Sequence, residues 1–364
     1  MTKSVAPDSE VRRKHVAALQ RSIPITRMVD YGVPLGDALR VHEFTSTDAP
    51  ESWDDVCEAQ ARRHTTLAEG ALRTRCTRTA SQAWRAASAL LQCAQLNFNA
   101  DLPRKKTLYD LAAQAMAQHA ALSTDLTACV VPTPSGNLHG WIVHPPKAVL
   151  AAVVVVGGLS GWGISYLNMG RALASRGILA VLAEGPGQGL SRLREGVYLN
   201  ERTLPLFSKF LNAAGASSAS RFGVWGNSFG GLLAAQLAAR DPRVRAVCIN
   251  GAPMTTSVPT FRTAREQMEA LFGTREEQEL TDRLGMLSMD PQRQQFAAST
   301  LIVQGGRDVL VPLGEQLGFF ALSTAEEKSV LTWDDGEHTI YNHADERNSR
   351  IADWFAAQLD ASAV

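Results

Sequence analysis

The sequence predicts an α/β fold in which a mainly parallel β-sheet is flanked by helices and preceded by an all-helical N-terminal domain. Before about residue 125, apolar residues recur at the spacing of amphipathic helices. After that point, short β-branched runs alternate with helical stretches, the pattern of a parallel sheet covered on both faces. The chain has 364 residues and an apolar share of 45%, enough for two domains with cores. We therefore predict a helical N-terminal lobe at residues 1–125 and an α/β domain at residues 126–364.

Charge and hydropathy exclude several classes of partner. The 36 basic and 36 acidic side chains give a formal net charge of zero, which argues against a nucleic-acid binder that neutralises phosphates. The longest aliphatic run, Val149 to Val156, is too short to span a bilayer, and no signal peptide is predicted. The five cysteines are scattered and never form a CxxC pair, so we expect a reducing cytoplasm.

The N-terminal domain is predicted to contain at least three helices and no strand. They are expected at residues 53–68, 80–98 and 107–121. In the second of these, Trp84, Leu91 and Phe98 lie near one face of an amphipathic helix.

The α/β domain is predicted to begin with a hairpin, because residues 126–131 and 138–143 flank Pro-Thr-Pro-Ser-Gly-Asn. Further strands are expected at residues 149–156, 178–182, 222–225, 244–249, 301–303 and 329–333. Residues 250–297 interrupt the alternation with two helical segments, 262–272 and 275–285. We expect this insertion above the carboxyl edge of the sheet, where ligands bind in such folds.

A candidate nucleophile lies in Gly226-Asn227-Ser228-Phe229-Gly230, which has the GxSxG pattern. It follows a short apolar strand and precedes an Ala/Leu-rich helix. A sharp strand-to-helix turn pushes the serine hydroxyl out of the sheet, and the helix N-terminus stabilises nearby negative charge. The same pattern also occurs as an ordinary turn serine, but the strand–turn–helix context favours Ser228 as a nucleophile.

A base and an orienting acid follow in the expected order. Asp308 stands in the loop after the strand at 301–303, and His338 stands in the loop after the strand at 329–333. Both loops lie at the edge of the sheet that carries Ser228, so the three side chains can form a triad. His343 is a competing base, placed lower because we expect it about one turn into the following helix.

Two backbone amides are candidates for the oxyanion hole. The loop Gly157-Gly158-Leu159-Ser160-Gly161 follows a buried strand and offers the N–H of Leu159, and the N–H of Phe229 complements it. A tight glycine turn is the alternative interpretation of this loop, and both can hold together.

Cofactor and metal motifs in the same region are incomplete. The motif of a phosphate-binding loop is incomplete because Ile164 stands at its lysine position. The motif of a dinucleotide-binding loop is incomplete because Tyr166 stands at its third glycine position. Two histidine pairs are spaced five residues apart, without HExxH or a cysteine partner. We predict no cofactor and no metal.

Three segments together resemble one branch of the α/β-hydrolases. They are Gly157-Gly158-Leu159, Glu184-Gly-Pro-Gly-Gln-Gly189 and Gly226-Asn-Ser-Phe-Gly-Gly231. The branch contains 2,6-dihydroxypseudooxynicotine hydrolase, FrsA-type esterases and fungal polyketide-shortening hydrolases. The resemblance covers about residues 126–360, with weaker similarity from Tyr31 to Phe98. Glu184 replaces a more usual Asp, and Ser160 stands where an acidic residue is expected.

The resemblance implies an α/β-hydrolase fold with a helical cap that roofs the active site, a Ser/Asp/His triad without metal, and often a homodimer. It also implies cleavage of a carbon–carbon bond next to a ketone, or of an ester, in a small aromatic or polyketide-like acyl substrate. A general carboxylesterase or thioesterase, an acyltransferase or cyclase, and a non-catalytic binding protein stay open as alternatives. Ser160, Trp162 and Glu184 are candidate substrate or loop contacts, and for Glu184 we favour bonds to loop amides.

Overall fold

The computed structural model describes residues 7–46, 51–147, 149, 151–215 and 219–359. The chain divides into two compact units, which we describe separately. One comprises residues 1–98 and 102–124. The other comprises residues 125–364 together with the short segment Asn99–Asp101, which connects two helices of the first unit but groups with the second.

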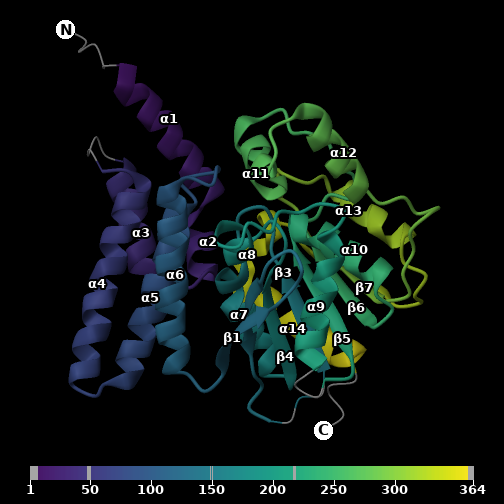
Figure 1. Cartoon of the computed structure of the whole chain (residues 1–364), viewed down its shortest axis with the longest axis horizontal. Coiled ribbons are helices and arrows are strands. Elements are labelled where there is room, and N and C mark those ends of the chain that lie inside the picture. Colours follow the sequence, from purple (N-terminus) through teal and green to yellow (C-terminus); the bar gives the residue numbers. More distant parts are fainter. Residues whose placement is uncertain (1–6, 47–50, 148, 150, 216–218, 360–364) are drawn as a thin grey trace. The chain divides into compact units, whose positions relative to one another are not determined.

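The first unit is helical throughout its described residues, as the sequence predicts. Its helices are α1 (Pro7–Ser22), α2 (Ile25–Asp30), α3 (Leu35–Ser46), α4 (Trp53–Arg73), α5 (Thr77–Gln95) and α6 (Pro103–Ala121). Helix α5 packs against both α4 and α6 (Figure 1). The Trp53 indole donates to the Cys93 carbonyl at 3.1 Å, and Arg104 of α6 donates to Asp54 of α4 at 3.0 Å. The three long helices are therefore joined by polar bonds as well as by apolar packing.

The second unit is built on an eight-stranded sheet with the order β1-β2-β4-β3-β5-β6-β7-β8. The strands are β1 (Leu126–Val131), β2 (Leu138–Val143), β3 (Ala151–Val156), β4 (Ile178–Glu184), β5 (Phe222–Asn227), β6 (Val244–Asn250), β7 (Ser299–Gly305) and β8 (Lys328–Trp333). Strands β1, β2 and β4 pair antiparallel, and the remaining pairs are parallel. Every residue of β3, β4 and β5 is buried, which explains their continuous apolar runs.

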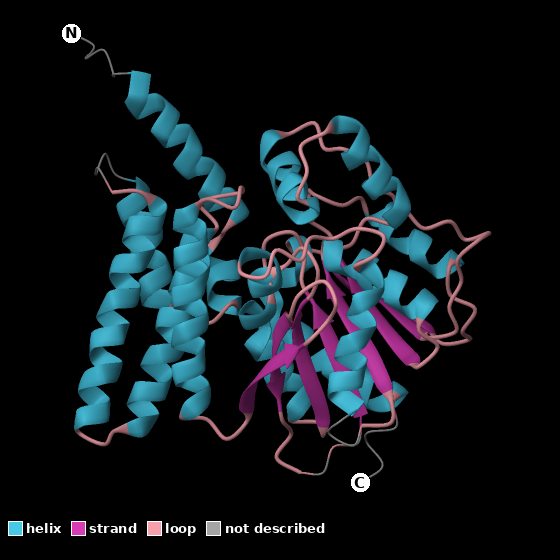
Figure 2. Ribbon diagram, in the orientation of Figure 1, coloured by secondary structure: helices cyan, strands magenta, loops and turns pink. Residues whose placement is uncertain are grey.

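Helices cover both faces of this sheet (Figure 2). Helices α7 (Leu167–Ala174) and α14 (Ala344–Gln358) pack together on one face, while α9 (Ser208–Gly215) and α10 (Phe229–Arg240) cover the other. Helix α8 (Gly189–Leu193) follows β4, and α13 (Leu313–Leu317) follows β7. Short 3-10 segments occur at Gly163–Tyr166, Leu204–Phe207, Gly318–Ala321 and His338–His343. The predicted α/β-hydrolase architecture, a mainly parallel sheet flanked by helices with a helical N-terminal region, is confirmed.

The insertion between β6 and β7 contains the two expected helices, α11 (Arg262–Phe272) and α12 (Glu277–Leu287). They lie together at one end of the sheet (Figure 1). Helix α12 is anchored on α10, because the Gln236 side chain donates to the Leu287 carbonyl at 2.6 Å. Their buried apolar residues, among them Leu271 and Leu284, join the core of the second unit.

Candidate active site

Ser228 lies in a strained turn between β5 and α10. Its backbone has φ 54° and ψ −133°, a left-handed φ that a residue with a Cβ rarely adopts. Strand and helix approach closely at this turn, and a Cβ at Gly226 would collide with the backbone of Gly230. The flanking glycines of the motif are therefore required by packing, and the turn presents the serine side chain at the carboxyl end of β5.

Asp308 follows strand β7, and His338 follows strand β8. In the sheet, β6 lies beside β5, β7 beside β6 and β8 beside β7. His338 Nδ1 lies 2.8 Å from Asp308 Oδ2, and His338 Nε2 lies 2.9 Å from Ser228 Oγ. A carboxylate only accepts hydrogen bonds, so Nδ1 donates to Asp308 and the lone pair of Nε2 accepts from the Ser228 hydroxyl. The structure thus brings the three predicted residues into one hydrogen-bonded chain.

The Asp308 carboxylate is fully buried and satisfied on both oxygens. While Oδ2 accepts from His338, Oδ1 accepts from the backbone N–H groups of Leu310 at 2.8 Å and Val311 at 3.2 Å. Hydrogen bonds to the charged form stabilise a buried carboxylate. The His338 side chain is 15% exposed, so its ring lies between a buried acid and the solvent-accessible side of the site.

His343 lies outside this arrangement. Its Nε2 is 2.8 Å from Asp335 Oδ1, and the bond with His343 holds the pKa of Asp335 below its ordinary value. The expectation that His343 lies a turn into the following helix is wrong. Residues 338–343 form a separate 3-10 segment in which Thr339 and Ile340 have positive φ, and His343 is the N-cap of α14.

Asn250, which sequence reasoning missed, connects the nucleophile turn to the histidine loop. The Asn250 carbonyl accepts the Ser228 N–H at 2.7 Å, and its side-chain amide donates to Asn227 Oδ1 at 3.0 Å and to the Thr339 carbonyl at 3.2 Å. Fully buried Arg347 also donates to the Thr339 carbonyl, at 2.8 Å. The sequence does contain one indication of this contact, because an asparagine closely follows each of two predicted strands. In the structure these residues, Asn227 and Asn250, are in register on adjacent parallel strands.

The loop after β3 passes directly beside the nucleophile. A Cβ at Gly158 would lie 3.0 Å from Ser228 Cβ and 3.4 Å from Ser228 Oγ, so a larger residue there would crowd the serine side chain. Phe229 is the first residue of α10, and the Ser228 carbonyl accepts from Gly231 N–H at 2.8 Å. Within the described residues, neither the Leu159 nor the Phe229 amide donates to another protein atom. The two predicted donors directly follow Gly158 and Ser228 in the chain, the two residues that lie against each other at this turn.

The remaining predicted positions make structural contacts. Glu184 is 1% exposed, and its carboxylate accepts the Leu190 N–H at 2.6 Å, which is the loop-amide arrangement favoured for this residue. Trp162 is fully buried, and its indole donates to the Gly158 carbonyl at 3.2 Å. Ser160 is half-buried in the same loop.

Burial argues against a competing cysteine nucleophile. Burial raises the pKa of the Cys93 thiol to about 12 and that of Cys129 to about 11, and it raises the pKa of Cys248 well above its ordinary value. Because the thiolate is the nucleophilic form, the raised pKa values favour the less nucleophilic thiol form of these three side chains.

Neither a metal cluster nor a membrane span is found in the described part of the chain. It contains no group of three or more His, Cys, Asp or Glu side chains that could hold a metal ion. None of its helices is long and apolar enough to cross a bilayer.

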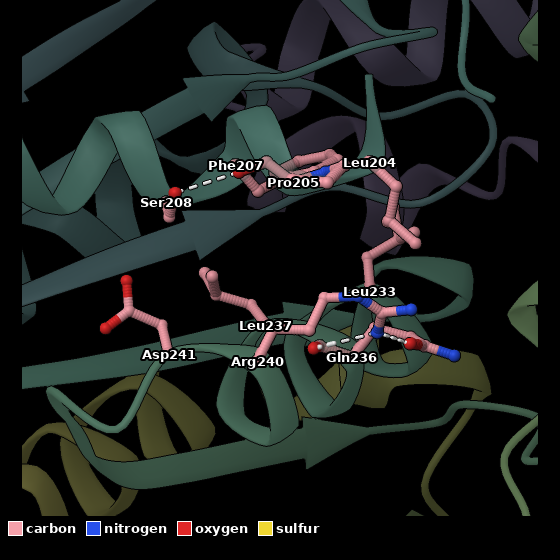
Figure 3. A pocket seen from close by; sticks show the side chains of 9 residues that line it. All are labelled: Leu204, Pro205, Phe207, Ser208, Leu233, Gln236, Leu237, Arg240 and Asp241. Carbon is pink, nitrogen blue, oxygen red and sulfur yellow. Dashed lines mark hydrogen bonds between the residues drawn. The ribbon is translucent and has the colours of Figure 1, made fainter. Parts of the chain in front are cut away.

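A cavity of about 110 Å³ lies beside the C-terminal half of α10 (Figure 3). Its lining comes from residues 204–208 and from one side of α10, ending at Arg240 and Asp241. The Arg240 guanidinium donates to the Gln236 carbonyl at 3.3 Å, and Arg243 donates to the Asp241 carboxylate. Because Ser228 precedes the opposite end of this 12-residue helix, the cavity is separate from the triad.

Comparison with known proteins agrees with this architecture. Residues 206–362, which contain all three triad positions, match the sequence model of the prolyl oligopeptidase family. None of the curated proteins matches the chain significantly. Among solved structures, that of 2,6-dihydroxy-pseudo-oxynicotine hydrolase has a TM-score of 0.79 at 21% identity, covering 92% of this chain and 96% of that one. Wild-type AbyA5 has a TM-score of 0.72 at 19% identity, covering 94% and 99% of the two chains.

At these identities the similarity to solved structures establishes the fold, and it extends over the helical N-terminal region as well as the sheet. The family match covers the strands and loops that position Ser228, Asp308 and His338. The fold that the sequence motifs indicate is confirmed, and the chain has the α/β-hydrolase fold.

Proposed function

We propose that the protein is a serine-type hydrolase of a small acyl substrate, with Ser228 as nucleophile, His338 as base and Asp308 as orienting acid. The observation that carries the proposal is the chain of two hydrogen bonds, 2.8 Å and 2.9 Å, that runs from a buried carboxylate through an imidazole to a serine on a strained turn. These contacts have the lengths that proton transfer requires.

The reaction follows from this geometry. Ser228 Oγ attacks the substrate carbonyl while His338 Nε2 takes its proton, and Asp308 stabilises the imidazolium that forms. The Leu159 and Phe229 amides hold the oxyanion of the tetrahedral intermediate. The imidazolium then protonates the leaving group, and a water activated by His338 releases the acyl group from Ser228.

We further propose that the leaving group is a carbon, in a substrate whose scissile bond lies next to a ketone. The resemblance to a branch that includes such enzymes supports this. A carbon–carbon bond breaks in this mechanism only if the departing carbon is a stabilised carbanion or is protonated as it leaves. His338 is the available acid once it has taken the Ser228 proton. An ester is the alternative substrate, because an alkoxide or phenoxide leaves more easily.

Two measurements test the proposal. A fluorophosphonate should label Ser228 in the wild-type protein, and the absence of labelling would overturn the serine-hydrolase assignment in favour of a non-catalytic binding protein. A β-diketone or acylphenol should then be hydrolysed in preference to a p-nitrophenyl ester of the same acyl group. If only the ester is turned over, and the diketone neither reacts nor competes with it, the protein is an esterase and the proposal of carbon–carbon cleavage is wrong.

Removal of the helical unit is expected to destroy selectivity or solubility. The segment Asn99–Asp101 is bound within the second unit: Asn99 donates to Glu266 at 2.8 Å, and Asp101 pairs with Arg192 at 3.2 Å. A chain that begins at residue 126 loses this segment and leaves the 1%-exposed Arg192 without its carboxylate, a loss of about 3–5 kcal/mol. Soluble yield and substrate selectivity measure the effect, with Asp101→Asn as the variant that removes the ion pair alone. Wild-type kinetics from the shortened chain would contradict the proposed cap. A homodimer and a cytoplasmic location stay predictions.

A further inference from the structure

Two carbonyls of the loop beside Ser228 are held by buried side chains. Gln188 Nε2 donates to the Gly157 carbonyl at 2.5 Å and, over a longer distance of 3.4 Å, to the Gly158 carbonyl. The Trp162 indole N–H is the nearer donor to the Gly158 carbonyl, at 3.2 Å. Both side chains are fully buried. The direction of these two peptide groups is therefore set from behind the loop, by side chains that do not reach the solvent.

The bond from Trp162 bears on the proposed oxyanion donor. The Gly158 carbonyl and the Leu159 N–H belong to the same planar trans peptide, so they point in opposite directions. A donor that holds the carbonyl on one side therefore fixes the N–H on the other. Gly158 stands beside the Ser228 side chain, so close that a Cβ added to it would lie 3.4 Å from Oγ. This peptide therefore adjoins the position of a reacting carbonyl.

Trp162 is itself held by a buried cation. The guanidinium carbon of Arg192 lies 4.7 Å from the centre of the indole ring, a distance typical of cation–π stacking. Arg192 also donates to the Gly187 carbonyl at 2.9 Å and pairs with Asp101, and its side chain is 1% exposed. Because its two terminal nitrogens contact the Gly187 carbonyl and the Asp101 carboxylate, the guanidinium is held over the indole ring.

We infer that Trp162 is a positioning residue whose indole N–H orients the Leu159 amide toward the oxyanion, with Arg192 and Asp101 holding the indole in place. The inference rests on the proposed serine-hydrolase function and adds to it a residue that touches neither substrate nor triad. The Asn99–Asp101 segment thereby contributes to the geometry of the oxyanion hole through three successive contacts: Asp101 with Arg192, Arg192 with Trp162, and Trp162 with Gly158.

Trp162→Phe is the direct test, because it removes the indole N–H and keeps an aromatic ring under Arg192. The matched control is Trp225→Phe in β5. Trp225 is equally buried, and within the described residues its indole N–H has no hydrogen-bond partner. Both variants lose the same atoms from a buried position, so the change in packing is matched between them. Only Trp162→Phe removes a hydrogen bond to the loop.

The expected result is a fall in kcat of about 10- to 30-fold for Trp162→Phe, with KM within about twofold of wild type. Deleting a whole oxyanion donor costs about 10²–10³ in kcat, and a donor that is misoriented retains part of its effect. A boronic acid that forms a tetrahedral adduct on Ser228 should bind more weakly by the same factor as kcat/KM. A merely structural role would lower the melting temperature without this split between kcat and KM.

Equal kcat in the Trp162→Phe and Trp225→Phe variants, or a change in KM alone, would overturn the inference. If Trp162→Phe does not fold, Arg192→Lys takes its place, because lysine keeps the charge beside Asp101 and loses the flat stacking face. That variant should lower kcat about threefold, and an unchanged kcat would contradict the positioning role. Fluorophosphonate labelling separates this result from the underlying proposal. An unlabelled wild type overturns both, whereas equal labelling rates in wild type and Trp162→Phe overturn the inference alone.

Discussion

Replacement of Ser228 by alanine is expected to lower kcat by about 10³-fold or more while the protein stays folded. The hydroxyl is the proposed nucleophile, and it lies 2.9 Å from His338 Nε2. Alanine has the same Cβ as serine, so the backbone strain at φ 54° is unchanged by the substitution. Turnover of the preferred substrate and the thermal melting temperature are the two measurements.

The control for this variant is Ser175→Ala, at the exposed end of α7. It should retain wild-type kinetics. More than about a tenth of wild-type activity in purified Ser228→Ala would remove Ser228 from the role of nucleophile.

Replacement of His338 by alanine is expected to be nearly as damaging as loss of Ser228. In the proposed mechanism the imidazole both accepts the serine proton and protonates the leaving group, so its loss affects both halves of the reaction. The double variant Ser228→Ala/His338→Ala should be no slower than either single variant, because residues that act as a unit have non-additive effects. Initial rates for the three variants and the wild type measure this.

His343→Ala is the matched control, since His343 pairs with exposed Asp335 and makes no contact with the triad. Its effect on kcat should be less than about threefold. If the two histidines exchanged these effects, the assignment of His338 as the base would be wrong.

The order of the triad along the chain, and much of the sheet, could be predicted because each depends on local patterns. A β-branched run bounded by turn residues specifies a strand by itself, and β1 and β2 have the predicted bounds. Strand β7 extends from Ser299 to Gly305 although only its three central apolar residues were predicted, because Thr300 and Gln304 are buried polar residues inside it. Polar residues of this kind do not distinguish a strand from a loop in the sequence, so the length of the strand follows only from its pairing with neighbouring strands.

The contacts around the triad depend on information that no local pattern carries. The bond between Asn227 and Asn250 joins residues 23 positions apart and requires the register of β5 against β6. Thr339 and Ile340 are β-branched residues in left-handed conformation, which propensity disfavours and which the bonds from Asn250 and Arg347 to the Thr339 carbonyl maintain. The sequence makes Trp162 a candidate substrate or loop contact, and only the structure shows that it is buried and bonded to the Gly158 carbonyl.

The hydrogen bonds of Asn250 have a practical consequence for identifying the natural substrate. They hold the His338 loop through the Thr339 carbonyl and the turn through the Ser228 backbone, and neither bond involves the serine hydroxyl. Loss of that hydroxyl in Ser228→Ala is therefore expected to leave the imidazole and the proposed oxyanion donors in place. Such an inactive protein should bind the substrate without converting it. After incubation with an extract of metabolites, the bound substrate can be released by unfolding the protein and identified by mass spectrometry.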